Sequence, residues 1–446
     1  MQEYRLIMQY KNEHGRYIND EVITSGTITP PEEITDLGLR HSEQIELLQK
    51  IQDNLLNKQS EYLKENISHC PKCGNKLRKN GANKCSFNAV FTDHKVPVYR
   101  QLCGKCQWSS VPSIDSLFGT HMHPDLIKMQ CEEAAAQSYS KAQDSLNRKA
   151  CKKRKVNSTM TIHGVIERVG NYISQHPDET IPEVQPASEL VIQVDGGHIK
   201  AKKDGSRSFE AMATVVYRPE NAVTYGTVER GKIISKHCAS SALDDQQEQI
   251  RRLTLTAARK QGMTKDTDIT ALCDGASNCW SVIKHLEHYC KSVVHILDWF
   301  HISMKFQNIG SFKTEKLNKL RESAKWALWH GKTDLFFTRI NELIGQIQGG
   351  NRKVIKKLNG LKQYIVNNAS KIVDYNARKS QNLVFTSNVA ECTIESLINQ
   401  RCKGKQHMQW SREGVQPILQ IRATSASNDW VQNCQKYILA AYKNAA

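Results

Sequence analysis

Two closely spaced cysteine pairs constrain the local fold of this 446-residue chain more than any other feature of its sequence. Cys70 and Cys73 form one Cys-x2-Cys pair, and Cys103 and Cys106 form a second. A loop with this spacing points two thiolates at one ion, so two loops complete a tetrahedral zinc site with four cysteine ligands. The strand-like residues between the pairs predict a zinc ribbon at 67–120, in which structural Zn2+ replaces a core too small to form alone. Four unrelated thiols or two disulfides are the alternatives.

The net charge predicts a polyanionic partner. The chain has 62 lysines and arginines against 45 aspartates and glutamates, a formal charge of +17. A surplus of this size favours binding to nucleic acid, and a merely basic protein is the alternative. No apolar run reaches membrane-spanning length, and the N-terminus lacks the sections of a signal peptide. We therefore expect a cytoplasmic protein with no membrane partner and with reduced cysteines.

Two further segments surround the ribbon. Residues 1–66 combine β-like segments with a long amphipathic stretch, which predicts a packing helix or a short oligomer-forming helix. Residues 121–176 contain two helical stretches, and Ser158 is the expected N-cap of the second. This pattern fits a helix-turn-helix-like DNA-binding region, with a plain helical hairpin as the alternative. The expected DNA contacts are the basic run between the helices: Lys152, Lys153, Arg154 and Lys155.

A new domain is expected after the proline-rich acidic linker at 177–189. Three antiparallel strands are predicted in "LVIQVDGGHIKAK", "SFEAMATVVYR" and "VTYGTVER", followed by a helix and by alternating strands and helices. This order is typical of an RNase H-like mixed α/β sheet flanked by helices. The core would occupy 190–310 and 381–446, around a lysine-rich helical insertion at 311–380. The residues with core spacing in that insertion are Trp326, Trp329, Phe336 and Phe337.

Asp195 interrupts the first apolar strand and is followed by two glycines, a combination that a core keeps only at a turn or a functional site. In the predicted topology its strand neighbours the one ending at Asp274, so the two carboxylates converge where α/β sheets bind ligands. Crowded carboxylates are stabilised by divalent cations, and two Mg2+ or Mn2+ ions ~4 Å apart support in-line displacement at phosphorus. A turn residue at Asp195 and a helix cap at Asp274 are the alternatives.

A third carboxylate is expected from a helix in 381–446. Glu391 and Glu395 lie one turn apart on the same face, and spacing alone does not choose between them. A solvent-facing charge is the alternative role for Glu391.

The C-terminal sequence resembles the signature of the Kra family of bacterial insertion-sequence transposases, which are of DDE type. The residues that carry the resemblance are "SNVAEC", "QRCKG", "MQWSREG" and "ILQIRA". The resemblance runs from Asp195 to the end of the chain and places the family glutamate on Glu391. It also matches "DWFHI" to a family motif, which implies roles for Asp298 and His301. Gln409 and Cys392 stand where the family usually has Arg and Ser.

The resemblance implies a bacterial, DNA-associated transposase that cleaves transposon ends and transfers the strands to target DNA. Its partners would be double-stranded DNA, as terminal inverted repeats and target, and further copies of the chain in a dimer or larger synaptic assembly. His301 would contact the scissile phosphate, or else form a structural hydrogen bond with Asp298. Further DNA contacts are expected at Arg401, Lys403, Trp410 and Arg412, with core packing as the alternative for Trp410.

Two rival functions share these features. An RNase H-like nuclease would use the same metal chemistry without strand transfer. A non-catalytic zinc-dependent DNA-binding regulator would use the ribbon and not the acidic residues.

Overall fold

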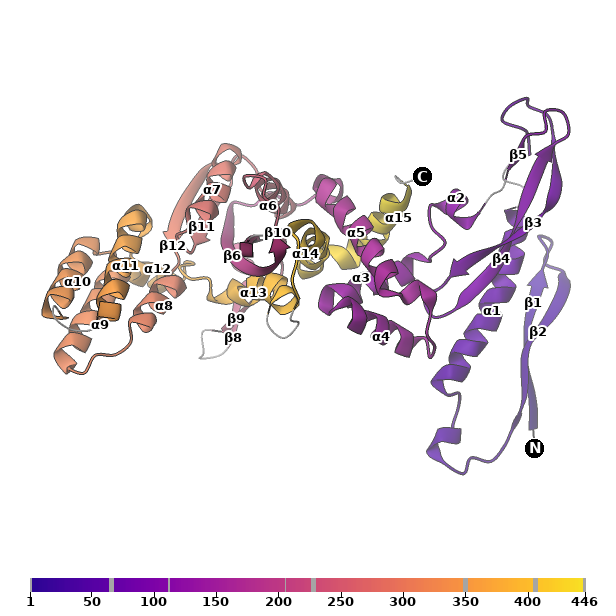
Figure 1. Cartoon of the computed structure of the whole chain (residues 1–446), viewed down its shortest axis with the longest axis horizontal. Coiled ribbons are helices and arrows are strands. Elements are labelled where there is room, and N and C mark those ends of the chain that lie inside the picture. Colours follow the sequence, from indigo (N-terminus) through magenta and orange to yellow (C-terminus); the bar gives the residue numbers. More distant parts are fainter. Residues whose placement is uncertain are drawn as a thin grey trace. The chain divides into compact units, whose positions relative to one another are not determined.

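The computed structural model describes residues 2–63, 68–110, 113–204, 206–225, 230–347, 352–403 and 408–443, with the backbone alone at 179, 203, 204, 206, 224, 225, 230 and 388–394. The chain forms two compact units (Figure 1). The first comprises Met1–Val169 with Cys434–Ala446, and the second comprises Gly170–Asn433. None of the described helices combines the length and apolar character that a bilayer crossing requires.

The first unit begins with a hairpin of β1 (Gln2–Lys11) and β2 (Tyr17–Ile28), followed by the long helix α1 (His41–Tyr62). A three-stranded antiparallel sheet follows, with β3 (Leu77–Asn88), β4 (Asp93–Cys103) and β5 (Ser109–Ser110). A chain of polar side chains ties α1 to this sheet, because the buried His94 bonds Asp53 of α1 through Nδ1 at 2.7 Å and Thr92 through Nε2 at 2.6 Å. This network pairs both ring nitrogens of His94, which is 3% exposed.

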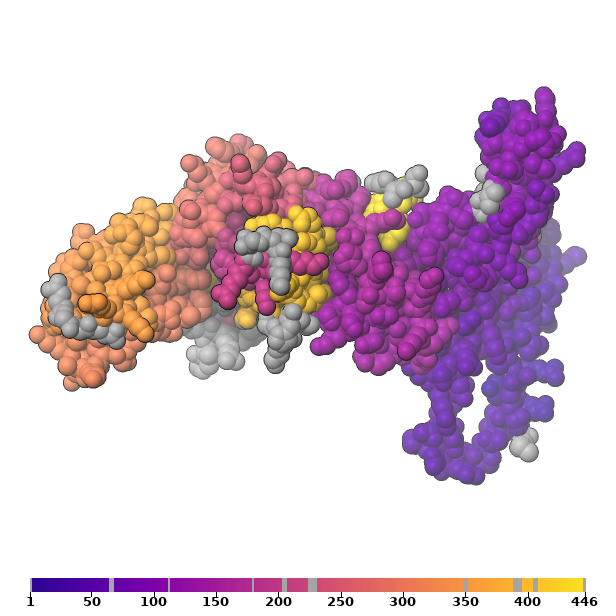
Figure 2. Space-filling view, viewed as in Figure 1, coloured from indigo at the N-terminus to yellow at the C-terminus, as the bar shows by residue number. Residues whose placement is uncertain are grey.

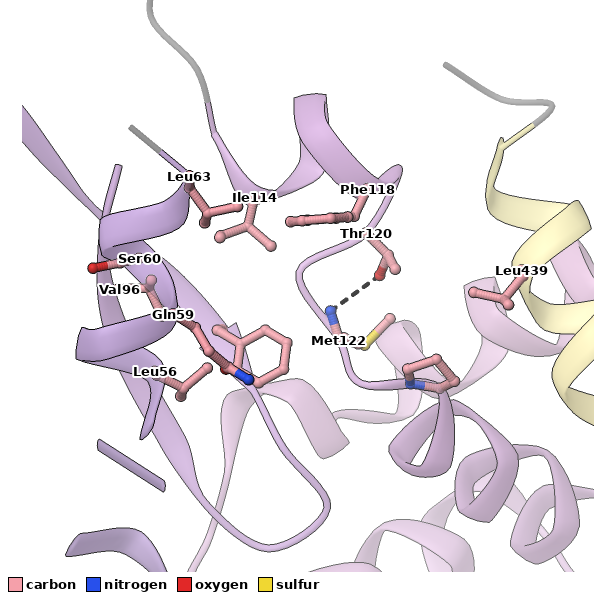
Figure 3. Close-up of a pocket in the computed structure, with 12 residues that line it drawn as sticks. Leu56, Gln59, Ser60, Leu63, Val96, Ile114, Phe118, Thr120, Met122 and Leu439 are labelled. Carbon is pink, nitrogen blue, oxygen red and sulfur yellow. Dashed lines mark hydrogen bonds between the residues drawn. The ribbon is translucent and has the colours of Figure 1, made fainter. Parts of the chain in front are cut away.

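Short helices complete the first unit: α2 (Ile114–Phe118), α3 (Pro124–Ala136), α4 (Tyr139–Lys149), most of α5 (Thr159–Gln175) and most of α15 (Asp429–Lys443). Ser158 accepts a hydrogen bond from the Thr161 N–H at 3.2 Å, which confirms it as the N-cap of α5. An apolar cavity of ≈ 390 Å³ lies between α1, β4 and α2 (Figure 3). Leu56, Ile114 and Phe118 are among the side chains that line it.

The second unit is built on a five-stranded mixed sheet with the order β10-β7-β6-β11-β12. The strands are β6 (Glu189–Asp204), β7 (Ser206–Tyr217), β10 (His237–Ser241), β11 (Asp268–Cys273) and β12 (Ser292–Leu297). β7 is antiparallel to both neighbours, whereas β6, β11 and β12 run parallel. The predicted adjacency of the Asp195 strand and the strand ending at Asp274 is therefore confirmed.

Helices cover both faces of this sheet. On one face, Leu190, Ile192 and Val194 of β6 pack in a core with α6 (Glu248–Lys260) and α7 (Ser277–Leu286). The other face meets α13 (Asn388–Cys402) and α14 (Arg412–Ala426). α13 approaches so closely that a Cβ on Gly197 would lie 3.0 Å from Ile398, which explains why this strand position is a glycine.

The predicted third strand is wrong. The "VTYGTVER" segment contributes β8 (Ala222–Tyr225) and, with its last residue, β9 (Arg230–Ile233), and among the described residues these two strands form a separate two-stranded sheet. The third strand of the main sheet is β10, whose sequence "HCASS" contains none of the strongest strand formers, Val, Ile, Thr, Tyr, Phe and Trp. Its burial between α6 and α14, rather than its local propensity, makes it a strand.

The region after β12 is helical: α8 (Trp299–Ile309), α9 (Glu315–Trp329), α10 (Thr333–Ile347), α11 (Arg352–Asn368) and α12 (Tyr375–Ser380). In the space-filling view these orange helices form a closely packed body (Figure 2). Trp329 and Phe336 are buried in it and Phe337 is half-buried, as their spacing predicts. Trp326 is 51% exposed, so its predicted core role is wrong.

Candidate functional site

Three aspartates lie side by side at the carboxyl edge of the sheet. The parallel strands β6, β11 and β12 pair in register, with Val194 opposite Cys273 and Cys273 opposite Leu297. The next residue along each strand is an aspartate: Asp195, Asp274 and Asp298. Residues that follow in-register parallel strands share one edge, and this edge is where α/β sheets place ligands.

The aspartates and His301 influence one another electrostatically. Burial raises the pKa of Asp195, and the negative charges of Asp274 and Asp298 raise it further. The Gly196 N–H, 2.7 Å from Asp195 Oδ1, and the charge of His301 act in the opposite direction. Among the described residues, the three aspartates and His301 do not form a group of three or more ligand atoms that all lie within 4.8 Å of one another.

Asp274 has a structural role that does not exclude ligation. Its Oδ1 accepts a hydrogen bond from the N–H of Ala276 at 2.8 Å, and Ala276 is the N-cap of α7, so Asp274 holds the turn before the helix and is not its N-cap. Gly275 has a φ of 94°, so the turn itself favours glycine. The Tyr364 hydroxyl of α11 donates to the Asp274 carbonyl at 2.6 Å. Sequence reasoning did not find this tyrosine, because it lies in the insertion far along the chain.

Asp298 anchors the start of α13. It is 1% exposed, and its Oδ1 accepts from the backbone N–H groups of Phe300 and Ser387, both at 3.0 Å. The Ser387 hydroxyl donates to Oδ2 at 2.5 Å, and His301 Nε2 lies 3.6 Å from that oxygen. Burial raises the pKa of Asp298, while the Ser387 hydroxyl and His301 lower it. Both carboxylate oxygens are therefore used inside the protein.

Glu391 lies in the first turns of α13, four residues after Ser387, which is the N-cap. At 1.5 Å per residue, this places its backbone about 6 Å along the helix from the residue held by Asp298. The Glu391 side chain lies outside the described residues, so its role as third ligand stays a prediction. Glu395, the alternative on the same helix, is exposed.

The predicted DNA-binding run near Lys152 divides into two kinds of residue. Lys152, Lys153 and Lys155 are exposed. Arg154 is 3% exposed, and its Nε and Nη2 donate to Asp93 Oδ1 at 2.9 and 2.7 Å. Its guanidinium also donates to the carbonyls that surround the β3–β4 turn, at Ala89, Val90 and Thr92. Arg154 therefore closes this turn and does not face solvent, contrary to the expected DNA contact.

The C-terminal predicted DNA contacts are mostly inside the second unit. Arg401 is fully buried, with its guanidinium 4.9 Å from the ring centre of Trp410, which is itself 5% exposed. Trp410 exchanges backbone hydrogen bonds with Lys200 and Lys202 of β6. The structure thus matches the packing alternative for Trp410. Arg412 is partly exposed and donates to the Ala242 carbonyl at 2.7 Å, and Lys403 is half-buried.

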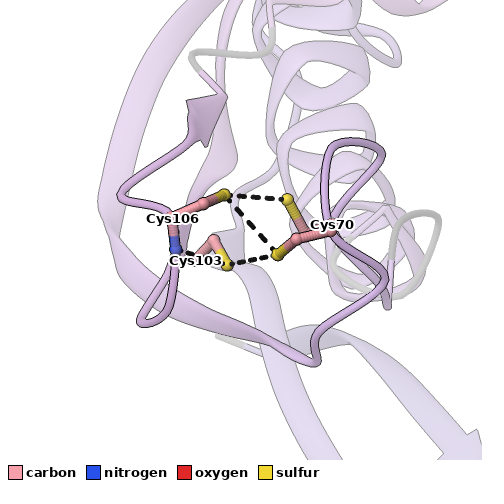
Figure 4. Close-up of side chains that lie close together, drawn as sticks. Cys70, Cys103 and Cys106 are labelled. Atoms are coloured by element: carbon pink, nitrogen blue, oxygen red, sulfur yellow. Dashed lines mark hydrogen bonds between the residues drawn. The ribbon is translucent and has the colours of Figure 1, made fainter.

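The four predicted zinc ligands converge (Figure 4). All Sγ atoms of Cys70, Cys73, Cys103 and Cys106 lie within 4.8 Å of one another, including 3.5 Å between Cys70 and Cys106. Within the part of the chain that the structure describes, no other group of three or more His, Cys, Asp or Glu residues is this compact. Four thiolates in this arrangement have the ligand set of a structural zinc site.

Comparison with known families identifies one match. Residues 122–434 match the Uncharacterised protein family (UPF0236). The chain belongs to the UPF0236 family. The UPF0236 region contains the three edge aspartates and α13, whereas the four clustered cysteines precede it.

Other comparisons add little to the UPF0236 assignment. No curated protein matches the chain. Among solved structures, a chain of the "Drosophila P element transposase strand transfer complex" aligns with 11% identity and a TM-score of 0.28. The alignment covers 68% of this chain and 92% of that one. A TM-score this low does not define a common fold.

Proposed function

We propose that this protein is a DDE-type transposase, with an RNase H-like core, that cleaves the ends of an insertion sequence and joins them to target DNA. The observation that carries the proposal is the register that brings Asp195 and Asp274 to neighbouring positions at the sheet edge. The sheet order and strand directions are those expected of an RNase H-like core. The Kra-like C-terminal signature supports the transposase over other enzymes with such a core.

Asp195, Asp274 and Glu391 would hold two Mg2+ or Mn2+ ions. Carboxylate oxygens are the preferred ligands of such ions, and the raised pKa of Asp195, which is caused by burial and by neighbouring negative charge, supports the proposal. Two bound ions supply Lewis-acid stabilisation of the attacking and leaving oxygens of a phosphodiester. The protein contributes placement: Asp274 stays at the turn that begins α7, and Asp298 holds the helix that carries Glu391.

His301 acts beside these carboxylates. Its charge lowers the pKa values of Asp195 and Asp298, so it favours their ionised forms. Its side chain is 26% exposed and remains accessible to a phosphate oxygen. We assign it a dual role, as partner of Asp298 and as contact to the scissile phosphate.

The zinc ribbon and the following helices would bind the terminal inverted repeats. Residues 68–110 contain a single acid, Asp93, which is bound by Arg154. Exposed cations cover the same segment: Lys72, Lys76, Arg78, Lys79, Lys84, Lys95, Arg100 and Lys105. A cationic surface without exposed, unpaired acids favours contact with phosphates over a purely scaffolding role. Cutting two ends together would require a dimer or larger assembly on DNA in the bacterial cytoplasm.

The test uses the full-length protein and the DNA that flanks its own gene. Mg2+-dependent nicks at the boundaries of inverted repeats, abolished by Asp195→Asn, Asp274→Asn and Glu391→Gln, are the expected result. Joining of a pre-cut 3′-hydroxyl end to plasmid DNA separates the transposase from a nuclease without strand transfer. Binding without any metal-dependent cleavage would instead identify a DNA-binding regulator.

A further inference from the structure

The β6–β7 hairpin extends beyond the main sheet and forms one wall of a groove of ≈ 460 Å³. The groove's other wall comes from Cys402 and Lys403 at the end of α13 and from Met408. Its lining includes His198, Lys200, Arg207, Ser208, Lys403 and Met408. Its volume is in the range of sites that enclose small molecules or single nucleotides.

The groove is cationic. Lys200 and Arg207 are exposed, Lys403 is half-buried, and the lining contains no carboxylate. None of these three side chains forms an ion pair with a carboxylate that the structure describes. Cations that gather in a concave site without an anionic partner attract phosphate, and Met408 adds an apolar surface suited to a base.

The position of the groove favours binding of single-stranded over double-stranded DNA. His198 lies three residues beyond Asp195 on the same strand, about 10 Å along it. The unbroken register from Val191 to Lys200 places His198 and Lys200 on the face of β6 opposite Asp195. A DNA strand that reaches both places must bend around the sheet edge. An unpaired strand can do so, whereas a duplex, with a persistence length of about 150 base pairs, resists such a bend.

We propose that this groove binds the unpaired DNA strand that leads away from the cleavage site. Lys200, Arg207 and Lys403 contact its phosphates, and Met408 contacts a base. The proposal rests on the proposed function for the identity of the strand, but the groove's preference for single-stranded DNA is measurable without cleavage.

The experiment compares Lys200→Ala/Arg207→Ala with a control of equal charge change, Lys316→Ala/Lys319→Ala on the exposed face of α9. The full chain is titrated with labelled dT20 and with a 20-base-pair duplex at several salt concentrations. We expect the groove variant to bind dT20 at least tenfold more weakly and to bind the duplex within twofold of wild type. Loss of two contacts should reduce the salt-dependence slope for dT20 by about 1.4.

An unchanged dT20 affinity, or an equal loss for dT20 and duplex, overturns the proposal. An equal loss of dT20 affinity in the control variant Lys316→Ala/Lys319→Ala also overturns the proposal. Because the substituted side chains are at the surface, an unchanged melting temperature confirms that both variants are folded. The groove proposal and the proposed function can fail independently of each other. If the protein never cleaves DNA but the groove variant selectively loses dT20 binding, the groove assignment stands. If the protein is an active transposase but the groove variant binds dT20 normally, the groove assignment is wrong.

Discussion

The carboxylate of Asp298 accepts hydrogen bonds from both the backbone N–H and the hydroxyl of Ser387, at 3.0 and 2.5 Å. Ser387 is the N-cap of α13, yet its hydroxyl serves Asp298 and makes no cap bond within its own helix. The end of β12 and the start of α13, distant in sequence, are therefore joined at the edge that carries Asp195 and Asp274. This junction makes Asp298 a positioning residue for the start of α13, the helix that carries Glu391.

The first prediction concerns this junction. Asp298→Ala removes the acceptor of three hydrogen bonds, two of them from Ser387, so we expect α13 to shift and Mg2+-dependent cleavage to fall about 100-fold, an effect that a misplacement near 1 Å can have. Ser387→Ala keeps the backbone bond and should have a smaller effect. The measurement is cleavage rate against Mg2+ concentration, in which the half-saturating concentration rises. A loss of rate without any change in that concentration would contradict the positioning role.

The second prediction concerns pH and metal binding at Asp195. Because its folded-state pKa is raised, the protonated carboxyl stabilises the fold below the unfolded-state pKa, and this contribution is lost as pH rises through the folded-state value. The metal-free protein should therefore lose stability over this interval, and Mg2+ should raise its melting temperature more at pH 8 than at pH 5. Asp195→Asn should melt above wild type at pH 8 without Mg2+ and respond little to Mg2+. An undiminished Mg2+ response in this variant would place the ions elsewhere.

The third prediction separates two neighbouring cations. Arg154→Ala removes five hydrogen bonds from the β3–β4 turn, so it should destabilise the first unit by at least about 2 kcal/mol. Lys153→Ala should leave stability unchanged and reduce the salt-dependence slope of duplex binding by about 0.9. Urea unfolding and anisotropy titrations measure the two effects. Equal stability of both variants would show that the buried guanidinium is dispensable.

The fourth prediction concerns the cysteine cluster. We expect one zinc per chain by mass spectrometry of the native protein, and loss of that metal in Cys103→Ser together with a lower melting temperature of the first unit. Cys85→Ser is the matched control, because Cys85 lies on β3 of the same ribbon and outside the cluster. Retention of full zinc content by Cys103→Ser would contradict the assignment.

Short sequence patterns were sufficient to predict the parts of the candidate sites whose residues lie close together in sequence or at the ends of strands. The Cys-x2-Cys spacing identified the cysteine cluster, and aspartates at the ends of apolar strands identified two edge carboxylates. Features that depend on contacts between segments distant in sequence could not be predicted from the sequence. β10 has no strand propensity of its own, and Arg154 resembles its exposed lysine neighbours until Asp93 and the turn carbonyls are placed around it. Ser387 carries no signal at all, because its importance arises only from the buried carboxylate opposite.

The acidic edge is assembled from parts that are synthesised far apart in time. Asp195 lies in the first strand of its sheet, while the helix that carries Glu391 comes after all the insertion helices. At translation rates of about 5–20 residues per second, that helix follows the strand by roughly 10–40 s. A nascent or prematurely terminated chain therefore has Asp195 without the helix that carries Glu391. Under the proposed function, such a chain lacks the third carboxylate and does not cut the genome that encodes it.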